Sequence, residues 1–278
     1  MNITIFGAGA YGAALGQILT DNGHNIRYYD PAKYPDTNLS EAMDGAEMHI
    51  LATPSAATPK LLFFIPKDKP LVCASKGLVS FAPFAGYEHL SAIGGGAFAD
   101  DLMNKKPTKL TTSSQETADL FKTDWLDFDI TTDTFGIMLC GTLKNIYSIG
   151  AGLWALEYGT QDYDDFINKS VAEMQIFLAN NGCDPATAGL SCGIGDLVLT
   201  SRSKTSRNYA FGAKLRQVPT LGADVLAGTA RINSTVEGLN AIDAIRHNPS
   251  FVRPATGVSN FDYIYAAVTN TPVPDLPV

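Results

Sequence analysis

The sequence predicts an α/β fold, in which an N-terminal, open, doubly wound parallel sheet is followed by an all-helical C-terminal domain. Short β-type runs alternate with helical runs in the first half, and strands separated by helices imply crossover connections. After about Phe135, long stretches with helical period replace the β-branched runs. The length of 278 residues allows two domains, which we expect at residues 1–135 and 136–278.

The elements of the first half are expected where short β-type runs and helical runs take turns. The expected strands cover residues 3–6, 26–29, 48–52 and 71–74, and the runs 109–113 and 128–132 are candidates to extend the sheet. Helices are expected between them at residues 13–19 and 56–64. Crossover helices of this kind cover both faces of a parallel sheet.

The elements of the second half are expected to be helices only. Apolar residues at helical spacing from Met138 to Leu156 mark one long helix, and those from Phe166 to Leu178 mark another. Further helices are expected at residues 192–200, 206–215 and 234–245. The tail 271–278 has three prolines in eight residues, so we expect it to be extended.

The charge balance is acidic, with 28 Asp and Glu residues against 20 Lys and Arg residues and a formal net charge of −8. Nucleic acid and anionic membranes require a basic face, so neither is an expected partner. A small anionic substrate stays possible, because a few Lys and Arg side chains can form a local positive pocket. No apolar run reaches 18 residues, and we expect no membrane insertion.

The cysteines and histidines lack the spacings that are typical of metal sites, so we expect no metal. The cysteines are expected to be buried free thiols in a reducing compartment. They are Cys73, Cys140, Cys183 and Cys192. The chain opens with a strand-like run and not with a signal peptide, which favours a cytoplasmic protein.

A G-x-G-x-x-G motif follows the first expected strand and opens a helix, which is the context of a Rossmann-type dinucleotide site. Gly7 allows the tight turn, Gly9 lets the backbone approach a pyrophosphate, and Gly12 lets the helix pack on the strand. The N–H groups at the helix start, around Ala10 and Tyr11, would hold the phosphates. The alternative is a glycine turn with a structural role only.

Asp30 ends the second expected strand, 18 residues after Gly12, close to the spacing at which an acid binds the adenine ribose. A carboxylate there favours NAD over NADP, because it repels a 2′-phosphate. Asp30 precedes Pro31 and can instead begin a turn, whereas Lys33 is near enough to accept an NADP phosphate. NAD is therefore the expected cofactor and NADP stays possible.

The loop after the third strand, Ala52-Thr53-Pro54-Ser55, is expected to line the cofactor cleft, with Pro54 at the cofactor. A plain loop with Ser55 as helix N-cap is the alternative. Lys76 follows the fourth strand, where open α/β sheets place their ligands, although a lysine in a loop is commonly only solvated.

Three further polar residues interrupt apolar or helical segments of the second half. Lys144 lies within an otherwise apolar helix, where a cation without a role is costly unless it snorkels to the surface. Asp196 lies in a second apolar stretch, and Thr200 follows one helical turn later. A carboxylate beside Lys144 would tune the proton affinity of its ammonium group.

Ser206 reads as the cap of a helix that begins with Arg207, so this segment can hold a phosphate or carboxylate, although such helix starts are common on surfaces. Together these features favour an oxidoreductase for a small anionic ketone or alcohol. The dinucleotide supplies a hydride, a buried lysine protonates an alkoxide, and an arginine anchors an anionic tail.

The motifs together resemble those of the NAD(P)-dependent glycerol-3-phosphate dehydrogenases. The matching segments are Gly7–Gly12, Ala52–Ser55, Ser75-Lys76-Gly77-Leu78, Gly141-Thr142-Leu143-Lys144-Asn145, Gly193-Ile194-Gly195-Asp196-Leu197, Ser206-Arg207-Asn208 and Thr235-Val236-Glu237-Gly238. The resemblance implies reversible reduction of dihydroxyacetone phosphate to sn-glycerol 3-phosphate, which feeds glycerophospholipid synthesis. It also implies a Rossmann domain, a helical domain and a homodimer.

The resemblance also assigns roles to single residues. Lys144 is similar to the family's catalytic lysine, which donates a proton to the ketone oxygen, and Lys76 to the second lysine, which orients the substrate at the cofactor. Asp196 would complete the catalytic group. The residues implied to bind the substrate are Asn145, Thr200, Arg207 and Asn208. The residues implied to bind the cofactor besides the glycine turn are Lys76, Ala99, Arg207 and Glu237.

Four segments depart from the family pattern. Gly95-Gly96-Ala97-Phe98-Ala99 lacks the proline and the hydroxyl that usually precede Phe-Ala, the stretch after Asp30 is short, residues 159–165 are unusually acidic, and the C-terminal end is abbreviated. These departures keep two alternatives open. One is a related dehydrogenase for another small anionic hydroxy compound, and the other is an NAD-binding sensor that has lost catalysis.

Overall fold

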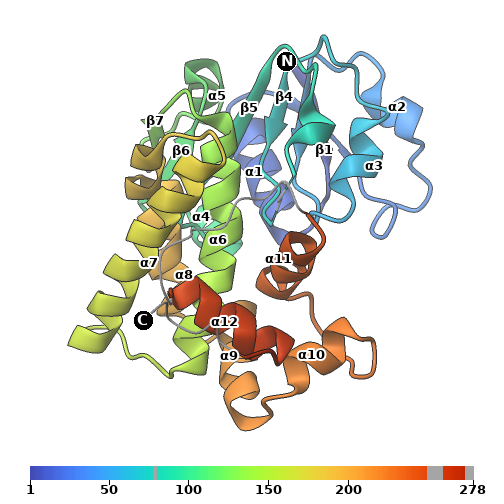
Figure 1. The fold of residues 1–278 in the computed structure, drawn as a ribbon. Coiled ribbons are helices and arrows are strands. Elements are labelled where there is room, and N and C mark those ends of the chain that lie inside the picture. The colour runs from blue at the N-terminus through green and yellow to red at the C-terminus, as the bar shows by residue number, and fades with distance from the viewer. Residues whose placement is uncertain (78–79, 249–258, 273–278) are drawn as a thin grey trace.

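The computed structural model describes residues 1–77, 80–248 and 259–272, and it has a sheet followed by a helical part (Figure 1). The strands are β1 (Asn2–Phe6), β2 (Asn25–Tyr29), β3 (Met48–Leu51), β4 (Leu71–Cys73), β5 (Leu90–Gly94), β6 (Thr108–Thr112) and β7 (Leu126–Ile130). The helical elements among them are α1 (Ala10–Asp21), α2 (Leu39–Met43), α3 (Thr58–Leu62), η1 (Ala82–Phe84), α4 (Ala99–Met103) and α5 (Gln115–Leu120).

Beyond β7, every regular element in the described part of the chain is a helix, which confirms the all-helical second half. These elements are α6 (Thr134–Leu153), α7 (Gln161–Asn180), η2 (Pro185–Gly189), η3 (Ser191–Gly195), α8 (Asp196–Ser201), α9 (Arg207–Gln217), α10 (Leu221–Leu226), α11 (Glu237–Arg246) and α12 (Asn260–Thr269). The last six residues of the tail expected to be extended lie outside the described residues.

The seven strands form one sheet in the order β2-β1-β3-β4-β5-β6-β7. Strand β1 lies between β2 and β3, which is the reversal of strand order typical of a doubly wound sheet. The expected doubly wound parallel sheet is confirmed, with one exception, because β5 and β6 pair antiparallel. Only the short helix α4 lies between them, and an antiparallel neighbour can start at the end of the sheet where the previous strand stopped.

Apolar side chains cover both faces of the sheet, because successive residues of a strand point to opposite sides. Ile5 and Ile50 pack with Leu15 of α1 in one cluster. Phe6 and Leu51 pack in the other cluster, which continues into the helical part. Burial on both faces explains why the central strands read as short, nearly continuous apolar runs in the sequence.

Helix α6 joins the two parts of the molecule (Figure 1). It packs on β5 on one side and on α9 and α11 on others, and its residues from Gly136 to Gly152 are buried. Its start is fixed by Asp133, whose side chain accepts a hydrogen bond from the backbone N–H of Gly136. A fully buried central helix therefore carries Lys144 and Asn145 into the interior.

Several elements were not anticipated from the sequence. They are β5, η1, η2, α2, α4, α5, α10 and α12. The single helix expected at residues 192–200 is instead a π-helical turn, η3, that runs into α8 at Asp196. A π-helical turn widens the backbone locally and often occurs at functional sites.

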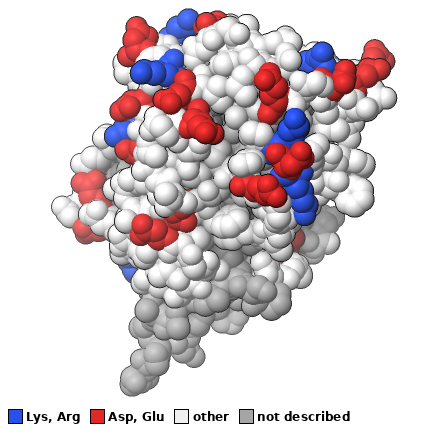
Figure 2. All heavy atoms as spheres, turned by 90° about the horizontal axis from the view of Figure 1, so that it is seen from above, with Lys and Arg blue, Asp and Glu red and all other residues white. Residues whose placement is uncertain are grey.

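The surface and the cysteines agree with the composition. All four cysteines are free and buried, as expected. On the face drawn in Figure 2, the described Lys and Arg side chains lie singly or in small groups among Asp and Glu, without a broad basic patch. A search of the described residues finds no helix that is both long and apolar enough to span a membrane.

Candidate active site

The candidate site lies at the carboxyl ends of β1, β3 and β4, where open α/β sheets place their ligands. Strand β1 is followed by the glycine turn, β3 by the loop of Ala52, and β4 by Lys76. Helix α6 and the π-helical turn bring Lys144 and Asp196 to this edge from the second half of the chain. The site is therefore built from both parts of the molecule.

Each glycine of the turn has a distinct reason to lack a side chain. Gly7 has a φ of +99°, and a Cβ there would lie 2.6 Å from the carbonyl oxygen of Ala52. A Cβ at Gly12 would collide with the carbonyl oxygen of Gly7. A Cβ at Gly9, by contrast, would meet no protein atom within 4 Å. Gly9 thus leaves open space above the helix start, as close backbone approach to a pyrophosphate requires.

The start of α1 fits a phosphate group for a second reason. Gly9 is its N-cap, and no side chain of the described residues caps it. The first N–H groups of a helix have no carbonyl partner within the helix, and they carry the positive end of its dipole. The backbone at Ala10 and Tyr11 is therefore suited to bind the pyrophosphate of a dinucleotide.

Asp30 is attached to the glycine turn. Its carboxylate accepts hydrogen bonds from the backbone N–H groups of Ala8, at 2.8 Å, and of Ala32, at 3.2 Å. Lys33 also contacts this turn, because its Nζ donates to the carbonyl oxygen of Ala8 at 3.1 Å. The structure therefore brings both residues that bear on cofactor choice to the first turn of the nucleotide site.

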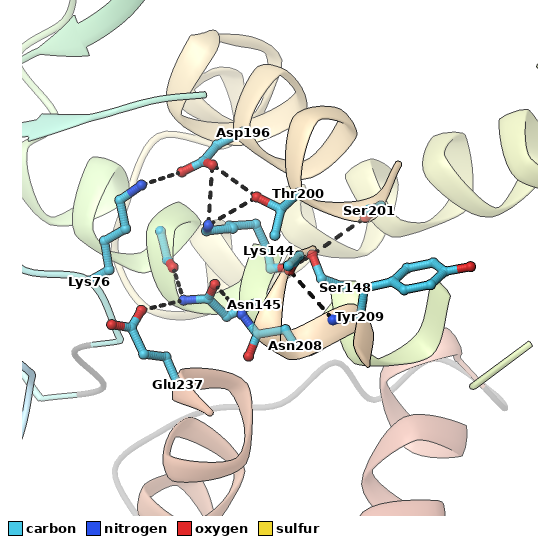
Figure 3. Close-up of polar contacts among 12 residues, drawn as sticks. Lys76, Lys144, Asn145, Ser148, Asp196, Thr200, Ser201, Asn208, Tyr209 and Glu237 are labelled. Atoms are coloured by element: carbon cyan, nitrogen blue, oxygen red, sulfur yellow. Dashed lines mark hydrogen bonds and ion pairs between the residues drawn. The ribbon is translucent and has the colours of Figure 1, made fainter. Parts of the chain in front are cut away.

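Two lysines converge on one carboxylate at the centre of the site (Figure 3). Lys76 Nζ lies 3.1 Å from Asp196 Oδ2, and Lys144 Nζ lies 3.1 Å from Asp196 Oδ1. Thr200 links to the same group, because its hydroxyl accepts from Lys144 and donates to Asp196, each at 3.1 Å. The side chains of Lys144 and Asp196 are 6% and 3% exposed, whereas that of Lys76 is 20% exposed.

The three charges shift one another's proton affinities. Burial lowers the pKa of Lys144, and Lys76 lowers it further, against the opposing effect of Asp196 and Glu237. Burial also lowers the pKa of Lys76, but the negative charges of Asp196 and Glu237 outweigh burial and hold that pKa above its usual value. Burial raises the pKa of Asp196, but the two ammonium groups outweigh it and the pKa lies below its usual value. Of the two lysines, Lys144 therefore releases its proton more readily.

A chain of amides lies beside the lysines. Asn208 Nδ2 donates to Asn145 Oδ1 at 2.8 Å, and Asn145 Nδ2 donates to Glu237 Oε2 at 3.1 Å. The backbone N–H of Gly238 donates to Asn208 Oδ1 at 3.0 Å, and Asn145 also donates to the carbonyl of Gly141. This chain fixes the relative positions of α6, α9 and α11 and orients the Glu237 carboxylate near the lysines (Figure 3).

Arg207 is the first residue of α9, directly after the cap Ser206. Its side chain is exposed, and within residues 1–77, 80–248 and 259–272 no hydrogen bond or ion pair holds it. Pro54 is exposed after β3, and Ala99 is half-buried at the start of α4. The structure leaves the assignments of these three residues as predictions.

Two features of the site were not anticipated from the sequence. The ring of Tyr11 lies under Lys76, with its centroid 5.2 Å from Nζ. The loop of Gly96 lies against the backbone before Asp196, because a Cβ at Gly96 would lie 2.9 Å from the carbonyl oxygen of Gly195. Neither contact joins residues that are close in sequence.

Among the described residues, no group of three or more His, Cys, Asp or Glu side chains is arranged to hold a metal ion.

Comparison with known proteins identifies similar chains over most of the length. Residues 133–250 match the family model "NAD-dependent glycerol-3-phosphate dehydrogenase C-terminus". Glycerol-3-phosphate dehydrogenase [NAD(P)+] of Desulfotalea psychrophila is 31% identical over 266 residues, which cover 77% of this chain and 78% of that protein. The protein of the same name from Staphylococcus haemolyticus is 28% identical over 294 residues, covering 88% of this chain and 87% of that one.

A solved structure has the same fold. The glycerol-3-phosphate dehydrogenase of Coxiella burnetii superposes with a TM-score of 0.79 over 97% of this chain and 94% of that chain. The two sequences are 21% identical, so this likeness concerns the fold, an N-terminal Rossmann domain with a C-terminal helical domain.

Proposed function

The chain belongs to the NAD(P)-dependent glycerol-3-phosphate dehydrogenase family, and on that premise we propose that it interconverts dihydroxyacetone phosphate and sn-glycerol 3-phosphate. The observation that carries the proposal is the meeting of Lys76 and Lys144 on Asp196 beside an open glycine turn. A dehydrogenase of this kind needs a dinucleotide cradle next to a proton donor, and this edge of the sheet provides both.

The residues of the cradle fit a nicotinamide cofactor. The glycine turn and the first N–H groups of α1 would hold its pyrophosphate, Asp30 its adenine ribose, and Glu237 its nicotinamide side. When bound there, the reduced cofactor supplies a hydride to the carbonyl carbon of the substrate. The remaining chemistry belongs to the side chains of this chain.

Proton transfer falls to Lys144. In the reduction, the ketone oxygen gains negative charge and takes a proton from the Lys144 ammonium, so the carbonyl becomes a hydroxyl and the lysine becomes a neutral amine. Asp196 and Thr200 hold Nζ at 3.1 Å and limit its orientations. In the oxidation, the neutral amine accepts the hydroxyl proton, so the same group serves both directions.

Substrate orientation falls to Lys76 and Arg207. Among the described residues the Lys76 ammonium has one hydrogen bond, to Asp196, which leaves two N–H groups that can face the substrate oxygens. Arg207 presents a guanidinium without a partner in the described part of the chain, at a helix start where the helix dipole also favours an anion. The hydrogen bond between Asn145 and Asn208 holds α6 and α9 together. Asn208 follows Arg207 in the sequence, and we propose that it contacts the same phosphate.

Further proposals rest on the family resemblance of the motifs alone. Residues 1–135 form the dinucleotide-binding domain, and residues 136–278 form the helical substrate-binding domain. The protein is a homodimer in the cytoplasm, and its product feeds glycerophospholipid synthesis. Sedimentation velocity of the purified protein tests the dimer.

The initial rate of NADH oxidation tests the function. Purified protein is assayed with dihydroxyacetone phosphate, beside NADPH and beside unphosphorylated dihydroxyacetone. Turnover that requires the phosphate supports the proposal. Tight NADH binding without turnover of any substrate would overturn it in favour of a sensor.

One observation favours a second candidate, a related dehydrogenase for another small anionic hydroxy compound. The loop of Gly96, which lacks the family's usual hydroxyl, lies against the backbone that carries Asp196. A change in this loop can therefore alter the position of Asp196. A panel of phosphorylated and carboxylated hydroxy compounds separates the two candidates by their kcat/KM values.

A further inference from the structure

Tyr11 stands out because its side chain contacts Lys76 of the candidate active site, although the glycine motif requires only its backbone. It is the second residue of α1, and its ring centroid lies 5.2 Å from Lys76 Nζ. A lysine ammonium within about 6 Å of an aromatic centroid is attracted by the negative face of the ring. Lys76 is therefore held from two sides, by the Tyr11 ring and by the Asp196 carboxylate.

The surroundings of the Tyr11 hydroxyl indicate which group of this side chain contacts Lys76. It is inaccessible to solvent and has no hydrogen-bond partner among the described residues. Burial raises the pKa of Tyr11, so the phenol stays neutral beside the lysine. A buried hydroxyl without a partner destabilises a folded protein, and a phenylalanine would avoid that cost. The ring, and not a hydrogen bond of the hydroxyl, is therefore the contact by which Tyr11 acts on Lys76.

We propose that Tyr11 is a positioning residue for the dehydrogenase reaction, which holds the Lys76 ammonium over its ring so that the remaining N–H groups of Lys76 meet the substrate. The proposal rests on the proposed function, because it concerns how that reaction orients its substrate. Lys76 is the more exposed of the two lysines and lies in a loop, and in the described part of the chain its Nζ would keep one hydrogen-bonded ion pair, to Asp196, without the ring. Lys144, in contrast, is enclosed by its buried helix.

The test is a double-mutant cycle between Tyr11 and Lys76. The variants are Tyr11→Leu, Lys76→Met and the double variant, with Tyr11→Phe as the matched variant that keeps the ring. Tyr11→Leu should lower kcat with dihydroxyacetone phosphate by about 3- to 30-fold, the range of a cation–π contact. Its NADH affinity, measured by fluorescence, should stay within about twofold, because the pyrophosphate is bound by the backbone.

Two comparisons decide whether Tyr11 acts through Lys76. In the Lys76→Met background, Tyr11→Leu should cause no further loss of kcat, whereas an equal loss in both backgrounds would overturn the proposal. Tyr11→Phe should keep wild-type kcat and an equal or higher melting temperature. A loss of activity in Tyr11→Phe as large as in Tyr11→Leu would also overturn it, because the hydroxyl would then be the group in use.

A second cycle keeps the proposal testable if the wild-type protein does not turn over dihydroxyacetone phosphate. The wild type, Tyr11→Leu, Lys76→Met and the double variant are unfolded with urea. The coupling between Tyr11 and Lys76 is measured from the unfolding equilibria of these four proteins. We expect a coupling of about 2- to 30-fold in that equilibrium. Additive effects would overturn the ring contact itself, whereas coupling without turnover would reject only the proposed reaction.

Discussion

The carboxylate of Asp30 accepts a hydrogen bond of 2.8 Å from the backbone N–H of Ala8, and this bond attaches the end of β2 to the glycine turn. The carbonyl of the same residue, Ala8, accepts a hydrogen bond from Lys33 Nζ. The acid is therefore fixed at the turn where we propose that the dinucleotide binds, and the nearby cation already has a partner.

This arrangement predicts a preference for NADH over NADPH. A 2′-phosphate would meet the Asp30 carboxylate, and Lys33 would have to leave Ala8 to neutralise it. We expect kcat/KM to favour NADH by about 10- to 100-fold, the range of a charge-assisted hydrogen bond. Asp30→Ser should reduce this ratio, and Lys33→Ala should leave it unchanged. A loss of NADPH turnover in Lys33→Ala alone would mean that the lysine binds the phosphate.

Much of the fold followed from local pattern. The strands of the first half, with the exception of β5, were expected within about two residues of their positions, because their short β-type runs alternate with helical segments. β5 was missed because Leu90-Ser91-Ala92-Ile93-Gly94 has only two large apolar residues. It is a strand because β4 and β6 flank it, a tertiary effect that local pattern does not carry.

The candidate site could be predicted as a set of residues but not as a network. Lys76, Lys144 and Asp196 stood out because they interrupt apolar segments or follow a strand, and the structure brings them together. Asn145 and Asn208 were assigned to the substrate, whereas the structure shows their amides bonded to each other. They are 63 residues apart, so their contact depends on the packing of α6 against α9.

The glycine turn predicts opposite outcomes for two alanine substitutions. Gly9→Ala should keep the melting temperature of the wild type, because its Cβ meets no protein atom within 4 Å and its φ of −61° suits alanine. Its NADH affinity, measured by fluorescence titration, should fall by at least about tenfold, because the methyl group occupies the space for the pyrophosphate.

Gly12→Ala should behave in the reverse way. Its Cβ would collide with the carbonyl oxygen of Gly7, so the turn must shift, at a cost of about 1–3 kcal/mol in the free energy of unfolding. Urea unfolding of both variants checks this. Equal stability of the two variants would contradict the different packing of Gly9 and Gly12.

Removal of the Lys144 ammonium is predicted to abolish proton transfer and spare cofactor binding. Lys144→Met should lower kcat by about 10²- to 10⁴-fold, the usual contribution of a general acid. NADH affinity should change by less than about twofold, because Lys144 contacts Asp196 and Thr200 and not the glycine turn. Lys214→Met on α9, an exposed lysine, is the matched control and should keep full activity. Near-normal kcat in Lys144→Met would remove this residue from the mechanism.

The shifted pKa of Lys144 predicts the pH dependence. Burial and the charge of Lys76 lower that pKa, so the ammonium loses its proton at a lower pH than an ordinary lysine. The reduction needs the ammonium form, and its kcat should therefore fall as the pH rises through this pKa. The oxidation needs the neutral amine, and its kcat should rise over the same interval. Asp196 raises the pKa of Lys144, so Asp196→Asn should move the pH dependence of kcat to lower pH for both reactions. An unchanged pH dependence would contradict the pairing of Asp196 with Lys144.

Arg207 is predicted to recognise the substrate phosphate without contributing to stability. Its guanidinium is exposed and has no partner in the described part of the chain, so Arg207→Ala should leave the melting temperature unchanged. The KM for dihydroxyacetone phosphate should rise by about 10- to 100-fold, because a charge-assisted contact is lost. Arg202→Ala, which removes the arginine stacked on Tyr158, is the control and should not change KM. The decisive comparison uses unphosphorylated dihydroxyacetone, for which kcat/KM should be the same with and without Arg207. An equal loss for both substrates would show that Arg207 supports the cleft and does not bind the phosphate.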